Sequence, residues 1–295
     1  MSSPQNTRLG IWLMIATSAV FAVQDGLSLH LGREANIYMV VMVRFWFFAA
    51  FAILMAARAP GGLRAAAKSA HPWLQILRGA LLIAEICVMV AAFVKLGLIE
   101  THAVFISYPL LIAALSGPIL GEKVGWRRWL AIFVGFVGIM IILQPGSGVF
   151  SIWALLPFAA ALMFAVYGLL TRYVARDDGP GVSFFWTGVA GAVAITPLGL
   201  MHWQNMSGGD WMLLLTLCCT AIIGHGLLIK AYDVAEASAI QPFAYFQMPF
   251  VSLLGFVLFS EVLRLNVLIG SAIVMAAGLF TLWRQRVREK RAGRG

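Results

Sequence analysis

Ten apolar segments, each of about 20 residues, follow one another along this 295-residue chain and are separated by short polar connections. A helix of that length crosses the hydrocarbon core of a bilayer, which is roughly 30 Å thick. Hydrophobic residues make up 61% of the chain and charged residues 11%, whereas soluble proteins average roughly 45–50% and about 25%. We therefore predict an all-α integral membrane protein with ten transmembrane helices. The predicted spans are 9–29, 37–57, 73–94, 99–120, 126–143, 152–173, 182–202, 211–231, 235–259 and 265–283.

Lysine and arginine are distributed unevenly between alternate connections. With the N-terminus in the cytoplasm, sixteen fall on the cytoplasmic side and only Arg33, Lys95 and Arg264 on the other. Connections rich in these residues stay in the cytoplasm, so both termini are predicted to be cytoplasmic. The same bias accounts for much of the net charge of +9, which in a soluble protein would suggest a nucleic-acid partner. We expect the lipid bilayer as a partner and no nucleic acid.

One pattern occurs twice, at 92–124 and again at 231–263. Each copy contains a short connection, an apolar helix broken by proline, and a turn marked by glutamate. The opening alanine lies 30 residues before the glutamate in both copies, and the proline-to-glutamate distance is 13 residues in one and 12 in the other. Broken helices at corresponding places in two halves indicate the substrate site of a membrane carrier. The matched residues are Ala92, Pro109 and Glu122 in the first copy and Ala231, Pro249 and Glu261 in the second.

Five spans in each half is an odd number, so the two halves are predicted to insert with opposite orientations. The turns agree, because Lys123, Arg127 and Arg128 follow Glu122, whereas only Arg264 follows Glu261. This is the inverted-repeat layout that serves alternating access. The predicted divisions are a first five-helix repeat at 1–145, a second, inverted repeat at 146–284, and a basic cytoplasmic tail at 285–295.

The paired segments resemble those of the drug/metabolite transporter superfamily, in its ten-helix EamA-type branch. The resemblance covers nearly the whole chain and rests on Ala231-Tyr232, Ala237-Ser238, Pro249 and Ser260-Glu261, with Gly121-Glu122 the best-kept part of the first half. Within the superfamily the chain is similar to the YddG-like amino-acid exporters of the bacterial inner membrane. The resemblance implies a central cavity lined by helices one to four and six to nine, with helices five and ten at the periphery.

Charged side chains inside a span are costly, so each needs a partner or a function. Asp25, beside Gln24 in the first span, is a candidate contact for a substrate amino group or a proton-coupling carboxylate. Alternatively, it reaches the outer interface or pairs with a basic neighbour. Arg44, Arg78 and Glu85 lie in spans two and three. The seven-residue separation of Arg78 and Glu85 gives a rise of about 10.5 Å, too long for a direct pair. Glu85 is expected to face Arg44 or the cavity, in a structural ion pair or a gate, and Arg44 and Arg78 are candidates for either role.

Proline removes a backbone donor and frees a carbonyl about four residues earlier, and a free carbonyl persists in a bilayer only where protein or a watery cavity satisfies it. Side chains beside the two breaks are therefore candidate cavity residues, although a kink can also serve packing alone. These candidates are His102 and Tyr108 in span four, and Gln241, Tyr245 and Gln247 in span nine.

Three further residues are candidates for the cavity. Trp46 and Tyr167 are mid-span aromatics suited to an apolar side chain, and with a cation each adds about 0.5–2 kcal/mol. Core packing is the alternative for both. His225 lies between two glycines in span eight and is either a cavity residue that titrates with pH or a helix-contact residue bonded to a neighbour.

Enzyme motifs are missing from the sequence, which holds no GxSxG, HExxH or Walker loop, so we do not expect an enzyme. No cofactor or metal is expected. The leading prediction is a multi-pass transporter of the bacterial inner membrane, a monomer or weak homodimer. It would export neutral and aromatic amino acids and related small metabolites by alternating access. The alternatives are export of amphipathic drugs or nucleosides, or a membrane-embedded lipid-handling enzyme.

Overall fold

The computed structural model describes residues 6–121, 125–144, 152–235 and 240–292, and the regular secondary structure in these residues is helical. Three long and two short α-helices come first: α1 (Thr7–Glu34), α2 (Ile37–Arg58), the short α3 (Gly62–Ala67), α4 (Pro72–Leu96) and the short α5 (Leu98–Phe105). The middle of the chain forms α6 (Tyr108–Leu120), α7 (Trp126–Leu143), the 3₁₀ turn η1 (Ile152–Ala154), α8 (Leu155–Val174) and α9 (Pro180–Met201). The remainder forms α10 (Gly208–Val234), the 3₁₀ helix η2 (Gln241–Phe246), α12 (Gln247–Phe259) and α13 (Leu265–Ala292).

Seven helical segments among the described residues are long and apolar enough to cross a membrane, and three shorter apolar helices accompany them. This confirms the prediction of an all-helical membrane protein. The seven are Thr7–Glu34, Ile37–Arg58, Pro72–Leu96, Leu98–Leu120, Ile152–Thr171, Pro180–Met201 and Gly208–Leu228. The shorter ones are Trp129–Leu143, Phe243–Phe259 and Leu265–Thr281.

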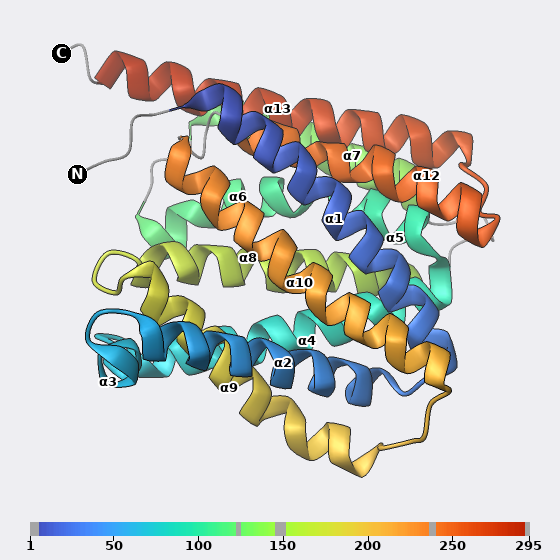
Figure 1. Cartoon of the computed structure of the whole chain (residues 1–295). Helices are drawn as coiled ribbons and strands as arrows, with labels where there is room; N and C mark the ends of the chain where they lie inside the picture. The colour runs from blue at the N-terminus through green and yellow to red at the C-terminus, as the bar shows by residue number, and fades with distance from the viewer. Residues whose placement is uncertain (1–5, 122–124, 145–151, 236–239, 293–295) are drawn as a thin grey trace.

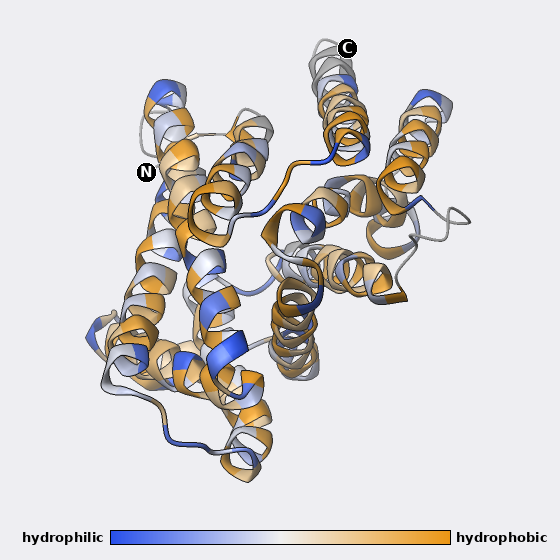
Figure 2. Cartoon of the chain, turned by 90° about the vertical axis from the view of Figure 1, so that its right-hand side faces the viewer, coloured by the Kyte–Doolittle hydropathy of each residue, from blue (hydrophilic) through white to orange (hydrophobic). Residues whose placement is uncertain are grey.

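The outer surface of the bundle is apolar. Large side chains such as Val193 and Phe256 expose 70% and 68% of their surface, and Figure 2 shows hydrophobic colour along the outward sides of the helices, with hydrophilic colour concentrated at connections and helix ends. In water a surface of this kind would cause aggregation, whereas in a bilayer it contacts lipid tails. Trp73 and Trp126 are also exposed, each in the first turn of its helix, where an interfacial belt places such residues.

Helices from the two ends of the chain pack side by side. α1 packs on α10, α2 on α9, α4 on α8, and α7 on α13, and Figure 1 shows the start of α1 and the end of α13 at the same end of the bundle as α3. Glycine allows the closest of these approaches. A Cβ on Gly138 of α7 would lie 2.9 Å from the carbonyl oxygen of Gly270 on α13, and a Cβ on Gly270 would lie 2.6 Å from that of Gly138.

Both predicted proline breaks fall at the end of a short helix. α5 ends at Phe105, where the amide of Ser107 bonds the carbonyl of Val104 in a tighter turn, and α6 then begins with Pro109 in its first turn. Proline has no amide with which to continue the ladder. In the second half, η2 passes into α12 at Gln247, two residues before Pro249. The two breaks bring irregular backbone into the interior.

Candidate functional site

Asp25, His102 and Gln247 form a partly buried polar cluster that joins α1, α5 and α12. Oδ2 of Asp25 lies 2.8 Å from Nε2 of Gln247 and 3.2 Å from Nε2 of His102. His102 is 1% exposed, and its ring stacks on Phe93 of α4 with centroids 5.4 Å apart and planes 7° apart. The structure thus brings together three side chains that the sequence predicted separately.

Unpartnered polar atoms gather around this cluster. In the described part of the chain, the buried side-chain atoms without a hydrogen-bond partner are Gln24 Oε1, Thr101 Oγ1, His102 Nδ1, Ser107 Oγ and Tyr245 OH. All five belong to α1, to α5 and its break with α6, or to η2. Buried polar atoms are rarely left unsatisfied in proteins, so their concentration here indicates a place where water or a ligand makes hydrogen bonds.

A small cavity lies at the α5–α6 break, between the two halves of the sequence. Its volume is about 10 Å³, and His102, Tyr108, Tyr245 and Gln247 are among its lining residues. These four residues are among those that the sequence predicted for a substrate cavity. The Tyr245 hydroxyl also lies where a side chain on Gly278 of α13 would have to be, so glycine at that position makes room for it.

Arg44 of α2 and Glu85 of α4 lie near the polar cluster without a close ion pair. They are 9% and 5% exposed, and the charge of Arg44 acts on both Glu85 and Asp25. Among the described residues, no contact within 4.0 Å joins a nitrogen of Arg44 to an oxygen of Glu85. The predicted pairing of Glu85 with Arg44 is therefore one of proximity rather than direct contact.

A row of aromatic rings leads away from His102 along α5, α6 and α8. Phe105 lies 6.0 Å from His102, Phe164 lies 5.6 Å from Phe105, and Tyr167 lies 6.0 Å from Phe164. Tyr108 packs edge-on against Phe164 at 5.0 Å. The row ends where the Arg78 guanidinium lies over the Tyr167 ring, 5.2 Å from its centroid.

Arg78 is tied to a network that the sequence did not predict. It is 1% exposed and donates to Thr171 Oγ1 at 3.0 Å and to Oε1 of Gln75. Gln75 in turn donates to Asp178 Oδ2 at 2.7 Å. Because Asp178 lies in the α8–α9 connection, these bonds fasten α4 to α8 and α9 at the end of the bundle that carries α3.

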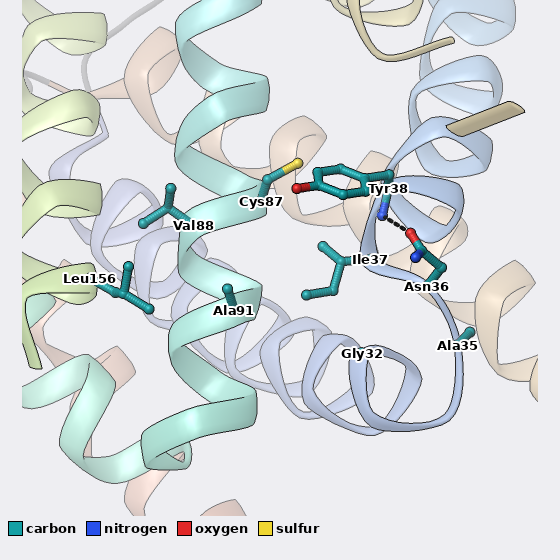
Figure 3. A pocket seen from close by; sticks show the side chains of 9 residues that line it. All are labelled: Gly32, Ala35, Asn36, Ile37, Tyr38, Cys87, Val88, Ala91 and Leu156. Atoms are coloured by element: carbon teal, nitrogen blue, oxygen red, sulfur yellow. Dashed lines mark hydrogen bonds between the residues drawn. The ribbon is translucent and has the colours of Figure 1, made fainter. Parts of the chain in front are cut away.

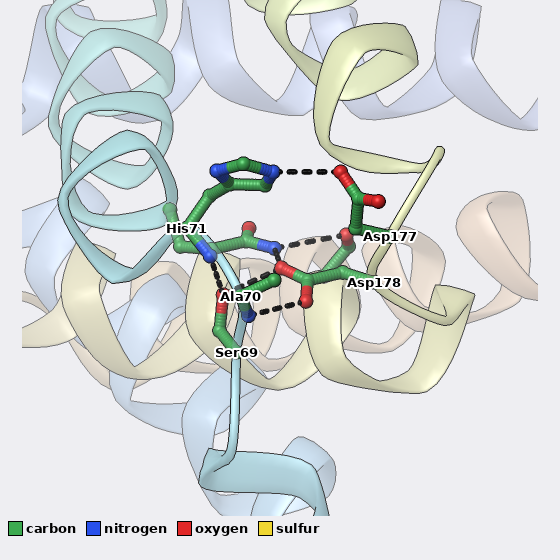
Figure 4. Close-up of polar contacts among 7 residues, drawn as sticks. Ser69, Ala70, His71, Asp177 and Asp178 are labelled. Atoms are coloured by element: carbon green, nitrogen blue, oxygen red, sulfur yellow. Dashed lines mark hydrogen bonds and ion pairs between the residues drawn. The ribbon is translucent and has the colours of Figure 1, made fainter.

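The Asp178 carboxylate also holds the α3–α4 connection, as Figure 4 shows. Ser69 Oγ donates to Oδ2, the Ala70 amide donates to Oδ1 at 2.8 Å, and His71 pairs with the neighbouring Asp177 at 2.8 Å. Burial alone would raise the pKa of Asp178, but the hydrogen bonds from Ser69, Ala70 and Gln75 outweigh it and hold this pKa below its ordinary value. The available sequence signal was an acidic pair, Asp177-Asp178, in a connection predicted to be basic.

The opposite end of the bundle holds a larger cavity and a second set of ties. The cavity is about 360 Å³ and lies between the α1–α2 connection, α4 and the start of α8. Figure 3 shows the Tyr38 ring reaching from α2 toward the Cys87 side chain of α4. At this end Arg264 pairs with Glu100 at 2.8 Å and His30 pairs with Asp210 at 3.3 Å.

The remaining predicted residues make no hydrogen bond to this cluster in the described part of the chain, or their side chains lie outside what is described. Trp46 is exposed, and its Nε1 donates to Thr196 of α9 at 2.8 Å. His225 packs edge-on against Phe21 and Phe48, at 5.4 and 5.8 Å. The Gln241 side chain lies outside the described side chains, as does Glu122. Within the described residues, no group of three or more His, Cys, Asp or Glu side chains is placed to hold a metal.

The model of the EamA-like transporter family matches residues 8–144 and 151–283. A solved crystal structure that is 17% identical covers 95% of this chain and 98% of its own with a TM-score of 0.62, which shows a shared fold.

Two kinds of named relative are similar to the chain. A riboflavin transporter of Vibrio cholerae is 34% identical over 187 residues, which is 61% of each protein. The chain therefore spans less than two thirds of that relative's length in the match. An S-adenosylmethionine uptake transporter of Rickettsia felis is 25% identical over 280 residues, 95% of this chain and 94% of the relative. A riboflavin transporter of Brucella anthropi is 24% identical over 91% of this chain and 96% of the relative.

Proposed function

The chain belongs to the EamA-like transporter family, and from that premise we propose that it carries flat heteroaromatic metabolites, of flavin or nucleoside type, across a bacterial inner membrane. Carriage is by alternating access and needs no enzymatic step. Both termini face the cytoplasm, and the transporter works as a monomer or weak homodimer.

The aromatic row beside the partly buried polar cluster carries this proposal. Stacking on an aromatic side chain stabilises a flat base by about 1–3 kcal/mol, and Phe105, Tyr108, Phe164 and Tyr167 place several such faces along one path. The Asp25 carboxylate then supplies a hydrogen-bond acceptor, and Gln247 supplies a side-chain amide, for the ring edge or the hydroxyl groups of the cargo. Riboflavin and S-adenosylmethionine, the cargoes that the relatives are named for, both join a flat heteroaromatic ring to a hydroxyl-bearing sugar or sugar-alcohol group.

The sequence-based prediction of amino-acid export receives no support from the named relatives. Their names specify riboflavin or S-adenosylmethionine, and two of the three cited say transporter without direction while one says uptake. We therefore favour uptake of these larger rings. Aromatic amino acids remain the competing cargo, because a row of rings also suits phenylalanine.

The helix pairings support two inverted five-helix repeats. In that layout the counterparts in the two halves are α1 and α8, α2 and α9, α4 and α10, and α7 and α13. The broken helix α5–α6 corresponds to η2–α12. If each helix is exchanged for its counterpart in the other half, the packed pairs α2–α9 and α7–α13 are unchanged. The packed pair α1–α10 becomes the pair α8–α4. All four pairings are observed, as a twofold relation between halves requires.

Alternating access requires one end of the path to close while the other opens. The Arg78–Gln75–Asp178 network fastens the end that carries α3, whereas the 360 Å³ cavity lies toward the other end. With the proposed topology, this arrangement is closed to the cytoplasm.

Riboflavin counterflow in proteoliposomes tests the proposal. Vesicles loaded with unlabelled riboflavin and holding the purified transporter should accumulate labelled riboflavin, and external S-adenosylmethionine should compete. Phe164→Leu should weaken riboflavin counterflow by about tenfold through lost stacking, while the control Phe280→Leu, on the exposed side of α13, should not. Counterflow of phenylalanine or methionine without riboflavin would restore the amino-acid prediction, and lipid turnover without counterflow would favour an enzyme.

A further inference from the structure

Arg44 of α2 is a buried cation for which the structure records no direct partner among the described residues. The residue is 9% exposed, and no hydrogen bond or ion pair joins its guanidinium to a described residue. Glu85 of α4 is 5% exposed and equally lacks such a contact in the described part of the chain. A guanidinium offers five donors, and a buried charge is costly unless it is paired. Both side chains therefore have polar groups to offer a ligand.

Two carboxyl groups lie around Arg44 at more than contact distance. The charges of Asp25 on α1 and Glu85 on α4 act on Arg44, and the three helices pack against one another. Among the described residues, however, neither carboxyl group has an oxygen within 4.0 Å of a guanidinium nitrogen. An amino-acid head group carries a carboxylate and an ammonium on the same carbon. Placed between these side chains, it would give Arg44 an anion and give the two carboxyl groups a cation.

Space remains at the polar ends of these side chains. The fully enclosed side-chain atoms without a partner in the described residues include no nitrogen of Arg44 and no oxygen of Glu85. Because those atoms also lack a recorded partner in the same part of the chain, they border space that admits water. The Asp25 side chain is 15% exposed. A small head group can enter this region by displacing water.

The aromatic row begins beside Asp25. Oδ2 of Asp25 lies 3.2 Å from Nε2 of His102, and the Phe105 ring lies 6.0 Å from the His102 ring. A cargo whose head group reaches Asp25 can therefore place an attached ring along Phe105 and Phe164. The charged side chains and the row together match a molecule with an amino acid at one end and a flat ring at the other.

We infer that Arg44, Asp25 and Glu85 form the binding site for the amino-acid head group of a cargo whose flat ring stacks on the aromatic row. Arg44 donates two parallel hydrogen bonds to the carboxylate of the head group, and the carboxyl groups of Asp25 and Glu85 accept from its ammonium. The inference rests on the proposed function for the ring alone. It narrows the cargo to heteroaromatic compounds that end in an amino acid, such as a nucleoside with an amino-acid side chain. A sugar hydroxyl would reach the same carboxyl groups, but only an anionic head group pairs with Arg44.

Arg78 of α4 shows the contacts of an arginine that serves packing. It donates to Thr171 and Gln75, and its guanidinium lies over the Tyr167 ring. Arg44 has no such set of contacts in the described part of the chain, so helix packing does not account for its place in α2. An arginine inside a span is costly and marks a substrate pathway where it has no structural partner.

Two ligands that differ in the head group test the site. S-adenosylhomocysteine and methylthioadenosine share the adenosine and a thioether sulfur, and only the first carries an amino acid. Dissociation constants, measured by tryptophan fluorescence of the purified transporter in detergent, should favour S-adenosylhomocysteine at least about tenfold. Arg44→Gln should remove this preference and leave the affinity for methylthioadenosine unchanged. Arg58→Gln, the same substitution at the exposed end of α2, should keep it. Equal affinities in the wild type, or a preference that survives in Arg44→Gln, would overturn the inference.

The melting temperature without ligand separates a binding role from a folding role. Arg44→Gln should melt like the wild type, because the substitution removes no recorded bond to a described residue. Arg44→Lys should recover part of the preference for S-adenosylhomocysteine, because lysine keeps the charge without the planar fork. Loss of the folded protein in both variants would assign Arg44 to folding and overturn the inference.

A second pair of ligands tests the head-group site if neither nucleoside binds, a result that would end the nucleoside-type cargo. Phenylalanine and phenethylamine share the ring and the amine, and only phenylalanine has a carboxylate. Phenylalanine should bind at least about tenfold more tightly to the wild type and should lose this advantage in Arg44→Gln. No preference for phenylalanine would overturn the head-group site as well.

Discussion

Glu261 Oε1 accepts a hydrogen bond from the backbone amide of Leu98 at 2.7 Å, across 163 residues of sequence. Oε2 accepts a second bond from the amide of Ile99 at 2.9 Å. A carboxylate at a helix N-terminus satisfies free amides and interacts favourably with the helix dipole. The glutamate that marks the repeat in the second half therefore holds the first turn of α5, the helix that carries His102.

Replacing this carboxylate should loosen α5. Glu261→Ala leaves the amides of Leu98 and Ile99 without their acceptor, and we expect a loss of about 1–3 kcal/mol in the free energy of unfolding. Glu261→Gln keeps one acceptor oxygen and should lose less. Melting temperatures in detergent, followed by tryptophan fluorescence, measure both. The control Glu34→Gln, at an exposed helix end, should melt like the wild type, and an equal melting temperature for Glu261→Ala would refute the capping role.

The close contact of α7 and α13 should not tolerate a side chain at Gly138. A Cβ there would lie 2.9 Å from the Gly270 carbonyl and 3.0 Å from Val274. Overpacking of this kind costs about 1–3 kcal/mol, so Gly138→Val should lower the melting temperature by several degrees. Gly226→Val adds the same side chain where nothing lies within 4 Å. Equal melting temperatures for the two variants would show that the close approach of α7 and α13 does not depend on Gly138.

Local sequence chemistry predicted much of what the structure describes. Hydropathy and segment length identify the helices. Pro109 and Pro249 mark the two breaks, because the amide that proline lacks would have formed a hydrogen bond within the same helix. Asp25, His102 and Gln247 were each predicted from being polar at a span interior or beside a break. Their mutual contact was not predictable, since it depends on how α1, α5 and α12 pack.

Arg78 makes contacts that depend on how the helices pack. The sequence predicts a gate or an ion-pair residue at this position and excludes a direct pair with Glu85. The structure instead satisfies it with Gln75, Thr171 and the face of Tyr167. Those contacts require α4 and α8 to pack together, and neither helix sequence by itself specifies the other as its neighbour.

Asp178 should make stability depend on pH in acid. Its pKa in the folded chain lies below the ordinary value of 3.8, so its contribution is fully present above that value and is lost as the pH falls through the folded pKa. At pH 7, Asp178→Asn should cost about 1–3 kcal/mol through weakened bonds to Ser69 and Gln75. The gap in melting temperature between wild type and Asp178→Asn should shrink as the pH drops below about 4. A gap that stays constant would show that ionised Asp178 is not what holds the two connections.

Glu85 tests whether a buried charge near the cluster serves folding or transport. Breaking a close buried ion pair costs about 3–5 kcal/mol, because one charge is left uncompensated. No contact within 4.0 Å joins Glu85 to Arg44 in the described residues, so Glu85→Gln should fold and express near the wild-type level. Its riboflavin counterflow should fall by about tenfold, because the variant removes the buried carboxyl group that interacts with the charge of Arg44. Glu34→Gln serves again as the matched control. Loss of the folded protein in Glu85→Gln, judged by size-exclusion chromatography, would instead assign Glu85 a structural role.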